Sequence, residues 1–244
     1  MGKAELFDLS ETEDSAAMED LLEKMDEISP NARDNAAHAL LYGFSEHGFA
    51  DPPLAAIQRF LQRVLSAAKK SENAVSEEGR LLAEQARTDR LDPDTEHVQM
   101  AASKVVREFD RLRGLLRFNP ETMENGKNFL CGKNCRYTAR CAPDHFVLPL
   151  LADHFWRRFG VESWAIIDEK RNIGLFSENG KEPALLRLDS KENFGNNAVK
   201  QNSDKWEALW KNYHRSINNG ERANPHLQKQ FMPRRYWKYL TEME

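Results

Sequence analysis

The strongest constraint on the fold is a change of hydrophobic period in the second half of the chain. From Leu148 to Phe159 the apolar side chains recur every three or four positions, which is the spacing of an amphipathic helix. Pro149 falls in its first turn, where a missing N–H costs no hydrogen bond, and Gly160 supplies a stop. Two short runs follow, at 164–167 and 173–176, and they have strand character. The stretch therefore predicts a helix packed on a β-hairpin.

The chain before this stretch has the pattern of a helical bundle. A capping residue followed by proline, the usual start of a helix, occurs at Ser29-Pro30, Asp51-Pro52 and Asp92-Pro93. The helix after Ser29-Pro30 is expected to stop near Gly48. We predict about five helices over residues 15–118, packed as a bundle and joined by short loops.

Residues 119–127 have strong turn composition and mark the predicted boundary to a mixed region over 119–244. We expect a strand or hairpin over 128–141, a further strand over 183–188 and a helix over 204–217. The fold class is therefore α+β: a helical N-terminal half is followed by a small antiparallel β-sheet with packed helices. A basic and aromatic tail closes the chain.

Composition favours a cytoplasmic protein. No apolar run approaches the roughly 20 residues of a membrane span, so we expect no membrane contact. The acidic N-terminus lacks the apolar core of a signal peptide. Three cysteines are an odd number, which does not suggest a disulfide framework.

The charge is distributed unevenly along the chain. Residues 1–28 carry ten acidic and two basic side chains, whereas residues 211–239 carry seven basic and one acidic. Residues 1–14 are expected to be disordered. The basic tail faces either a polyanion or only solvent, balanced by the acidic N-terminus.

Two histidines are candidates for acid–base chemistry. His145 follows Asp144, and a neighbouring carboxylate can tune an imidazole for proton transfer. His154 lies beside basic residues on the polar side of the predicted helix. The alternative is structural: Asp144 caps the coming helix and His145 bonds locally.

The three cysteines and one histidine are the candidate metal ligands: Cys131, Cys135, Cys141 and His145. Three thiols and an imidazole are a ligand set that zinc accepts. The spacing departs from that of a zinc knuckle, whose first pair is usually separated by two residues. We therefore predict no metal site, and interpret the cysteines as ordinary thiols in or beside a strand.

The corner of the predicted hairpin reads Lys170, Arg171 and Asn172. Two cations and an amide on a tight turn can grip a phosphate. A solvated turn is the alternative.

The tail interleaves cations with aromatic rings. Cations neutralise phosphates and rings stack on exposed bases. The alternative is that Phe231, Trp237 and Leu240 anchor the tail on the core, and both can hold together. The chain has no phosphate-binding loop, dinucleotide fingerprint, HExxH or nucleophile elbow, so we expect no cofactor. The candidate nucleic-acid-binding residues here are Arg234, Arg235, Trp237, Lys238 and Tyr239.

Four segments carry a family resemblance: REFDRLRGLLRF (107–118), APDHFVLPLLADHFWRRF (142–159), DEKRNIGLF (168–176) and HLQKQFMPRRYWKYL (226–240). They resemble the motifs of a bacterial family called probable DNA metabolism proteins, whose domain is formally one of unknown function. Members of that family are typically encoded beside a DNA-modification or repair protein of the radical SAM type. Related domains occur fused to uracil-DNA glycosylase-like domains.

The resemblance implies an accessory role in DNA metabolism, in repair or modification. The expected partners are DNA and a radical SAM-type or glycosylase-like protein. Two alternatives stay open. One is a nucleic-acid-processing enzyme with His145 and His154 as acid and base, and the other is a protein interaction module without DNA affinity.

Overall fold

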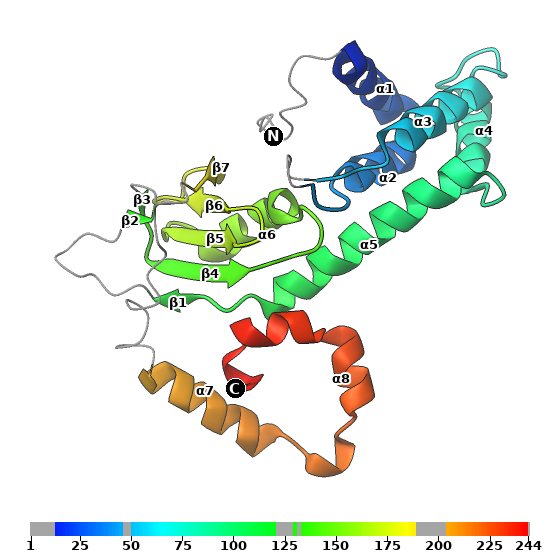
Figure 1. Ribbon diagram of the computed structural model, residues 1–244. Helices are drawn as coiled ribbons and strands as arrows, with labels where there is room; N and C mark the ends of the chain where they lie inside the picture. The colour runs from blue at the N-terminus through cyan, green and yellow to red at the C-terminus, as the bar shows by residue number, and fades with distance from the viewer. Residues whose placement is uncertain (1–12, 46–49, 121–128, 131–132, 189–203, 244) are drawn as a thin grey trace. The chain divides into compact units, whose positions relative to one another are not determined.

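The computed structural model describes residues 13–45, 50–120, 129–130, 133–188 and 204–243 (Figure 1). The chain forms two compact units. Unit 1 comprises Met1–Glu108 with Asp144–Val147, and unit 2 comprises Phe109–Pro143 with Leu148–Glu244. Most of the N-terminus expected to be disordered lies outside the described residues, as do most of the predicted break at 119–127 and the loop before residue 204.

Unit 1 is built from helices, as predicted. Ser29 and Ser76 cap the second and fourth helices by accepting hydrogen bonds from the N–H groups of Ala32 (3.4 Å) and Gly79 (3.1 Å). The apolar stripes meet in one core, where Met25 is fully buried. The elements are α1 (Glu13–Ile28), α2 (Pro30–Leu40), α3 (Leu54–Ala68), α4 (Glu77–Thr88) and the first part of α5 (Pro93–Leu115).

The segment 144–147 packs within unit 1, although the residues on either side of it in the sequence belong to unit 2. The Phe146 N–H donates to the carbonyl oxygen of Leu41 at 2.9 Å. The Glu108 carboxylate accepts from the N–H groups of Asp144 (3.0 Å) and His145 (2.7 Å). The Leu41 carbonyl thus accepts a hydrogen bond from a segment that is distant in the sequence. This explains why α2 ends at Leu40, before the stop predicted near Gly48.

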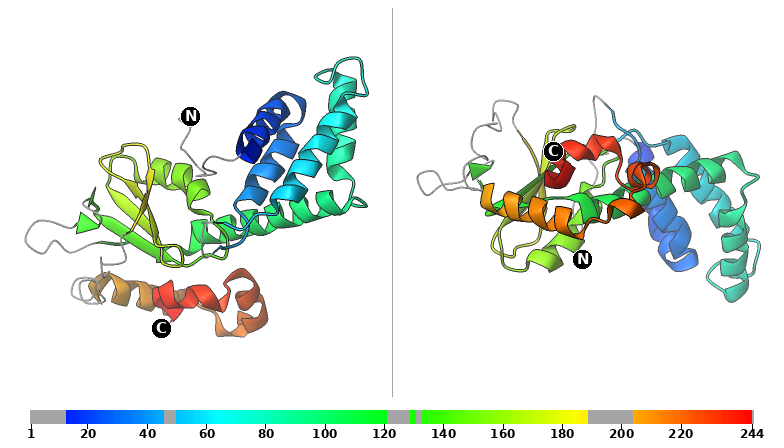
Figure 2. Two further views of the ribbon diagram at one scale, coloured as in Figure 1. Left: turned by 45° about the horizontal axis from the view of Figure 1, so that its top comes forward. Right: turned by 90° about the horizontal axis from the view of Figure 1, so that it is seen from below.

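Unit 2 contains a five-stranded sheet in the order β1-β4-β5-β6-β7. Helix α6 (Leu148–Phe159) packs on β5 and β6 (Figures 1 and 2). The rings of Phe155 and Phe159 in this helix contact the Trp164 ring of β5. The strands are β1 (Asn119–Pro120), β4 (Tyr137–Cys141), β5 (Trp164–Asp168), β6 (Ile173–Ser177) and β7 (Ala184–Arg187). A separate pair is formed by β2 (Phe129–Leu130) and β3 (Lys133–Asn134).

The α+β class is confirmed, but the sheet is mixed and the prediction of an antiparallel sheet is wrong. Strands β4 and β5 are parallel, with Tyr137 opposite Trp164 and Cys141 opposite Asp168. The chain leaves β4, runs through α6 and returns along β5, and such a helical crossover joins parallel strands. The predicted hairpin is present as the antiparallel pair β5–β6, in which every residue is buried.

The C-terminal part of unit 2 is a run of short helices. The turn η2 packs against β4, and η3 packs against α7. None of the helices in the described parts of the chain is long and apolar enough to cross a membrane. The elements are α7 (Asp204–Ile217), η1 (Gly220–Arg222), α8 (Pro225–Phe231), η2 (Arg234–Tyr239) and η3 (Thr241–Met243).

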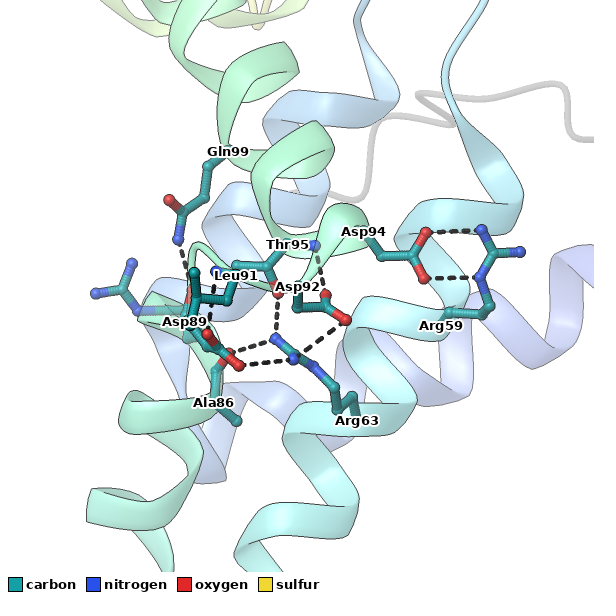
Figure 3. Close-up of polar contacts among 10 residues, drawn as sticks. Arg59, Arg63, Ala86, Asp89, Leu91, Asp92, Asp94, Thr95 and Gln99 are labelled. Atoms are coloured by element: carbon teal, nitrogen blue, oxygen red, sulfur yellow. Dashed lines mark hydrogen bonds and ion pairs between the residues drawn. The ribbon is translucent and has the colours of Figure 1, made fainter.

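A polar network in unit 1 joins α3 to the α4–α5 connection (Figure 3). The guanidinium of Arg63 donates to the carbonyl oxygen of Ala86 (2.7 Å) and to the buried Thr95 hydroxyl. It also forms ion pairs with Asp89 and Asp92, each at 3.2 Å. One side chain therefore satisfies acceptors from two other elements.

We expect Arg63→Ala to lower the free energy of unfolding by about 1–3 kcal/mol, because it leaves the Ala86 carbonyl and the Thr95 hydroxyl without this donor. Urea denaturation of the full chain measures the change. Arg59→Ala is the matched control: Arg59 also bonds a carboxylate, that of Asp94, but its side chain is 59% exposed. An Arg63→Ala loss no larger than the Arg59→Ala loss contradicts the role given to the network.

Candidate nucleic-acid interface

The corner between β5 and β6 is held by a buried ion pair. Asp168 accepts hydrogen bonds at one carboxylate oxygen from the N–H groups of Lys170 (2.9 Å) and Arg171 (3.2 Å). Its other oxygen binds the Arg171 guanidinium at 2.8 Å. The same guanidinium nitrogen donates to the carbonyl oxygen of Pro143 at 3.0 Å. Burial raises the pKa of Asp168, and these donors act against that rise.

The three residues predicted at this corner have different surroundings. The Arg171 side chain is 1% exposed, so the structure places its guanidinium in the interior and not at a phosphate-accessible surface. Lys170 is exposed. Asn172 is exposed and has a positive φ of 51°, a conformation that asparagine tolerates better than most residues. Lys170 is thus the corner's surface cation.

The tail residues of η2 lie on three sides of this 3₁₀-helix. A 3₁₀-helix has about three residues per turn, so residues three apart lie on one side. Tyr236 is buried and Tyr239 half-buried, which defines the inward side. Arg235 and Lys238 share a second side. Arg234 lies on the third, with its guanidinium carbon 5.7 Å from the ring centroid of Trp237.

Glu169 joins the corner to the tail. One of its carboxylate oxygens accepts hydrogen bonds from the Tyr239 hydroxyl (2.6 Å) and the Lys238 ammonium (3.2 Å). The other oxygen pairs with Arg140 at 3.5 Å. Two segments that are distant in sequence are therefore brought together around one carboxylate. We name the set Arg140, Glu169, Lys170, Lys238 and Tyr239 the corner–tail cluster.

The electrostatics of the cluster favour a charged Glu169. Partial burial acts to raise the pKa of Glu169, but the hydrogen bonds from Tyr239 and Lys238 and the charges of Lys238 and Arg140 together outweigh it, so the pKa lies below its ordinary value. Burial and the neighbouring Glu169 raise the pKa of Tyr239. The phenol therefore keeps its proton and acts as a donor. The cluster carries three cations against one anion.

The predicted tail aromatics Trp237 and Tyr239 form hydrogen bonds within unit 2. The Trp237 indole N–H donates to the carbonyl oxygen of Met232 at 2.9 Å, and the ring is half-buried. Leu240 is buried and anchors the tail, as one alternative predicted. Phe231 is 65% exposed, so its predicted anchoring is wrong. Arg234 and Arg235 are both exposed at the surface of η2.

His145 has a structural setting in unit 1. Its Nδ1 accepts a hydrogen bond from the Gly43 N–H at 3.0 Å, and its ring stacks on Tyr42 with centroids 4.8 Å apart. Lys104 donates to the Tyr42 hydroxyl at 3.3 Å. Asp144, the neighbouring candidate, is held through its backbone by Glu108. The imidazole of His145 thus joins residues 42–43 to the 144–147 segment, through its Nδ1 to Gly43 and through its ring to Tyr42.

His154 belongs to unit 2, whereas His145 belongs to unit 1. Burial lowers the pKa of His154, and the charges of Arg113 and Arg158 lower it further. Its Nε2 is buried and has no hydrogen-bond partner among the described residues. The pair predicted as acid and base is therefore divided between the two units.

The candidate metal ligands have separate settings. Cys135 is buried in a core cluster with Ala165 and Phe176. Cys141 is buried on β4, and its thiol donates to the carbonyl oxygen of Ile167 at 3.5 Å. Cys131 lies outside the described residues. Within the described ranges, no group of three or more His, Cys, Asp or Glu side chains is placed to hold a metal ion.

Sequence reasoning missed Glu169 and Arg140. Glu169 sits in the predicted corner, directly before Lys170, but an acidic residue does not stand out as part of a phosphate site. Arg140 is half-buried between buried Ala139 and Cys141 on β4, and no local pattern singles it out. Only the long-range contacts show that Arg140 pairs with Glu169 and that Glu169 binds the tail.

The chain matches the family described as Domain of unknown function, DUF4130, over residues 55–242. The chain belongs to this family. No curated protein and no solved structure matches the chain. The DUF4130 region begins in α3 and includes every described strand and the whole corner–tail cluster. The corner–tail cluster is therefore part of the family's domain.

We expect Tyr239→Phe to raise the pKa of Glu169, because it removes a donor that favours the carboxylate. An NMR titration of the Glu169 carboxyl carbon measures the pKa. Trp237→Phe is the control, since it removes a different donor of η2 and leaves Glu169 untouched. An unchanged pKa in Tyr239→Phe contradicts the arrangement around Glu169.

The same pKa gives a pH dependence of stability. The folded-state pKa of Glu169 lies below its ordinary value of 4.5. Its stabilising contribution is therefore complete above that value and is lost as the pH falls through the folded-state pKa. The difference in unfolding free energy between wild type and Glu169→Gln should shrink on acidification below pH 4.5.

Proposed function

We propose that this DUF4130 protein is an accessory protein of DNA metabolism that binds DNA through the corner–tail cluster and the neighbouring arginines of η2. The observation that carries the proposal is the convergence of Arg140 and Lys238 on Glu169, directly before the exposed Lys170. Phosphate contacts by lysine and arginine supply most non-specific affinity for DNA. Arg235 lies on the same side of η2 as Lys238, and Arg234 adds a further exposed cation on another side of this helix.

The rigidity of the cluster supports this assignment. Long cationic side chains lose conformational entropy when they bind, and a side chain already held in place loses less. Lys238 is held by Glu169, yet its side chain remains 61% exposed. The carboxylate therefore orients the cation without burying it.

The family resemblance supports a role in repair or modification beside a partner enzyme. On that basis the partner is a radical SAM-type DNA-modification or repair protein, or a glycosylase-like protein. In this arrangement the present chain supplies DNA affinity and the partner supplies the chemistry.

The enzymatic alternative receives less support. A general acid and base must both reach the reacting atoms. The Nδ1 of His145 accepts a hydrogen bond from Gly43, and the buried Nε2 of His154 has no hydrogen-bond partner among the described residues. The proposed function does not rely on these two histidines.

DNA binding should be salt-sensitive, and Arg234→Ala combined with Arg235→Ala should weaken it about tenfold or more at low salt. The slope of log affinity against log salt should fall by about two, one for each lost phosphate contact. Fluorescence anisotropy with labelled DNA across a salt series measures both quantities.

The matched control is Lys69→Ala combined with Lys70→Ala, which removes the same charge from an exposed site at the end of α3 in unit 1. This variant should retain the wild-type slope, and thermal unfolding checks that both double variants remain folded. Equal losses of DNA affinity in the two double variants would show that net charge alone accounts for the effect. Unchanged binding in the arginine variant would remove η2 from the interface.

A further inference from the structure

Helices α7 and α8 each expose large apolar side chains. On α7 these recur at helical spacing and so share one side of the helix. Tyr213 is 54% exposed and Phe231 is 65% exposed, although globular domains usually bury such rings. We name the set the α7–α8 apolar face: Leu209, Trp210, Tyr213, Ile217, Leu227 and Phe231.

Two rings of this face are held in a fixed arrangement. The centroids of Trp210 and Tyr213 lie 5.7 Å apart, with their planes inclined by 36°. The Trp210 indole N–H donates to Glu242 at 3.0 Å, and Glu242 binds Arg117 at 2.6 Å. The Arg117 guanidinium carbon lies 5.8 Å from the centroid of the Trp210 ring. An ion pair between the half-buried Arg117 and the largely buried carboxylate of Glu242 thus anchors an exposed aromatic pair.

The charge of residues 211–239 restricts which kind of molecule can bind the α7–α8 apolar face. Residues 211–239 contain seven basic side chains and one acidic side chain. Two copies of so basic a segment repel each other, which disfavours self-association through this face. The complementary occupant is a polyanion that also presents flat apolar groups.

Single-stranded nucleic acid has both properties. Its phosphates pair with cations, and its unstacked bases lie against aromatic rings. In a duplex each base face is covered by the next base pair, so surface rings have no base to stack on. We propose that the α7–α8 apolar face is a stacking surface for single-stranded nucleic acid, with Tyr213 and Phe231 as its contact rings. The inference rests on the proposed DNA-binding function and specifies its substrate class.

The test separates stacking from general apolar contact. Tyr213→Leu combined with Phe231→Leu keeps apolar side chains and removes both rings. We expect this variant to bind an oligothymidylate of about twelve nucleotides at least tenfold more weakly, while its affinity for the matching duplex is unchanged. Tyr213→Phe retains the ring and should retain wild-type affinity for the oligothymidylate.

Leu209→Ala is the control for an aliphatic member of the same face, and it should leave oligothymidylate affinity unchanged. Retained single-strand affinity in the double leucine variant overturns the inference. If the arginine variant of η2 still loses affinity, the proposed function survives. A loss in Leu209→Ala equal to that in the double leucine variant also overturns the inference, because the affinity would then come from general apolar contact and not from stacking. Absence of any nucleic-acid binding by the wild type overturns both proposals.

Discussion

The ion pair between Asp168 and Arg171 is the interaction on which the candidate interface depends. Removing two charges from water is costly, and the cost is offset only when every remaining donor and acceptor is satisfied. Here two backbone N–H groups and the Pro143 carbonyl supply those bonds. The corner is therefore held in one conformation. Glu169 and Lys170 lie between the two residues of this ion pair in the sequence, and the tail binds Glu169 there.

A single carboxylate then organises the surface. Glu169 holds Lys238 and Tyr239 from the tail and Arg140 from β4, so an acidic residue lies at the centre of a basic cluster. Such an anion lowers the net charge of the site, but it orients the cations before any ligand arrives. A second carboxylate, that of Glu242, accepts a hydrogen bond directly from the Trp210 indole N–H and pairs with Arg117 through its other oxygen. In both places a partly or largely buried carboxylate of unit 2 holds an exposed side chain.

Local patterns predicted the elements well and their long-range partners poorly. The helix from Leu148 to Phe159, the β5–β6 hairpin and the helix over 204–217 appear where the hydrophobic periods place them. The parallel pairing of β4 with β5 was not foreseen, because the two strands are related through a helix and not through a turn. The end of α2 was placed too late, because the Leu41 carbonyl is taken by Phe146, a residue from a distant segment.

The sequence by itself determined the α+β class, the positions of most helices and strands, and the basic aromatic character of the tail. These follow from the spacing of apolar residues, from caps and from composition, which act over a few residues. Only the tertiary structure decided which of those residues share a site. It buried Arg171, left Lys170 exposed, placed Glu169 against the tail and exposed the rings of α7 and α8. These outcomes depend on contacts between distant segments, and the local spacing of apolar residues does not predict such contacts.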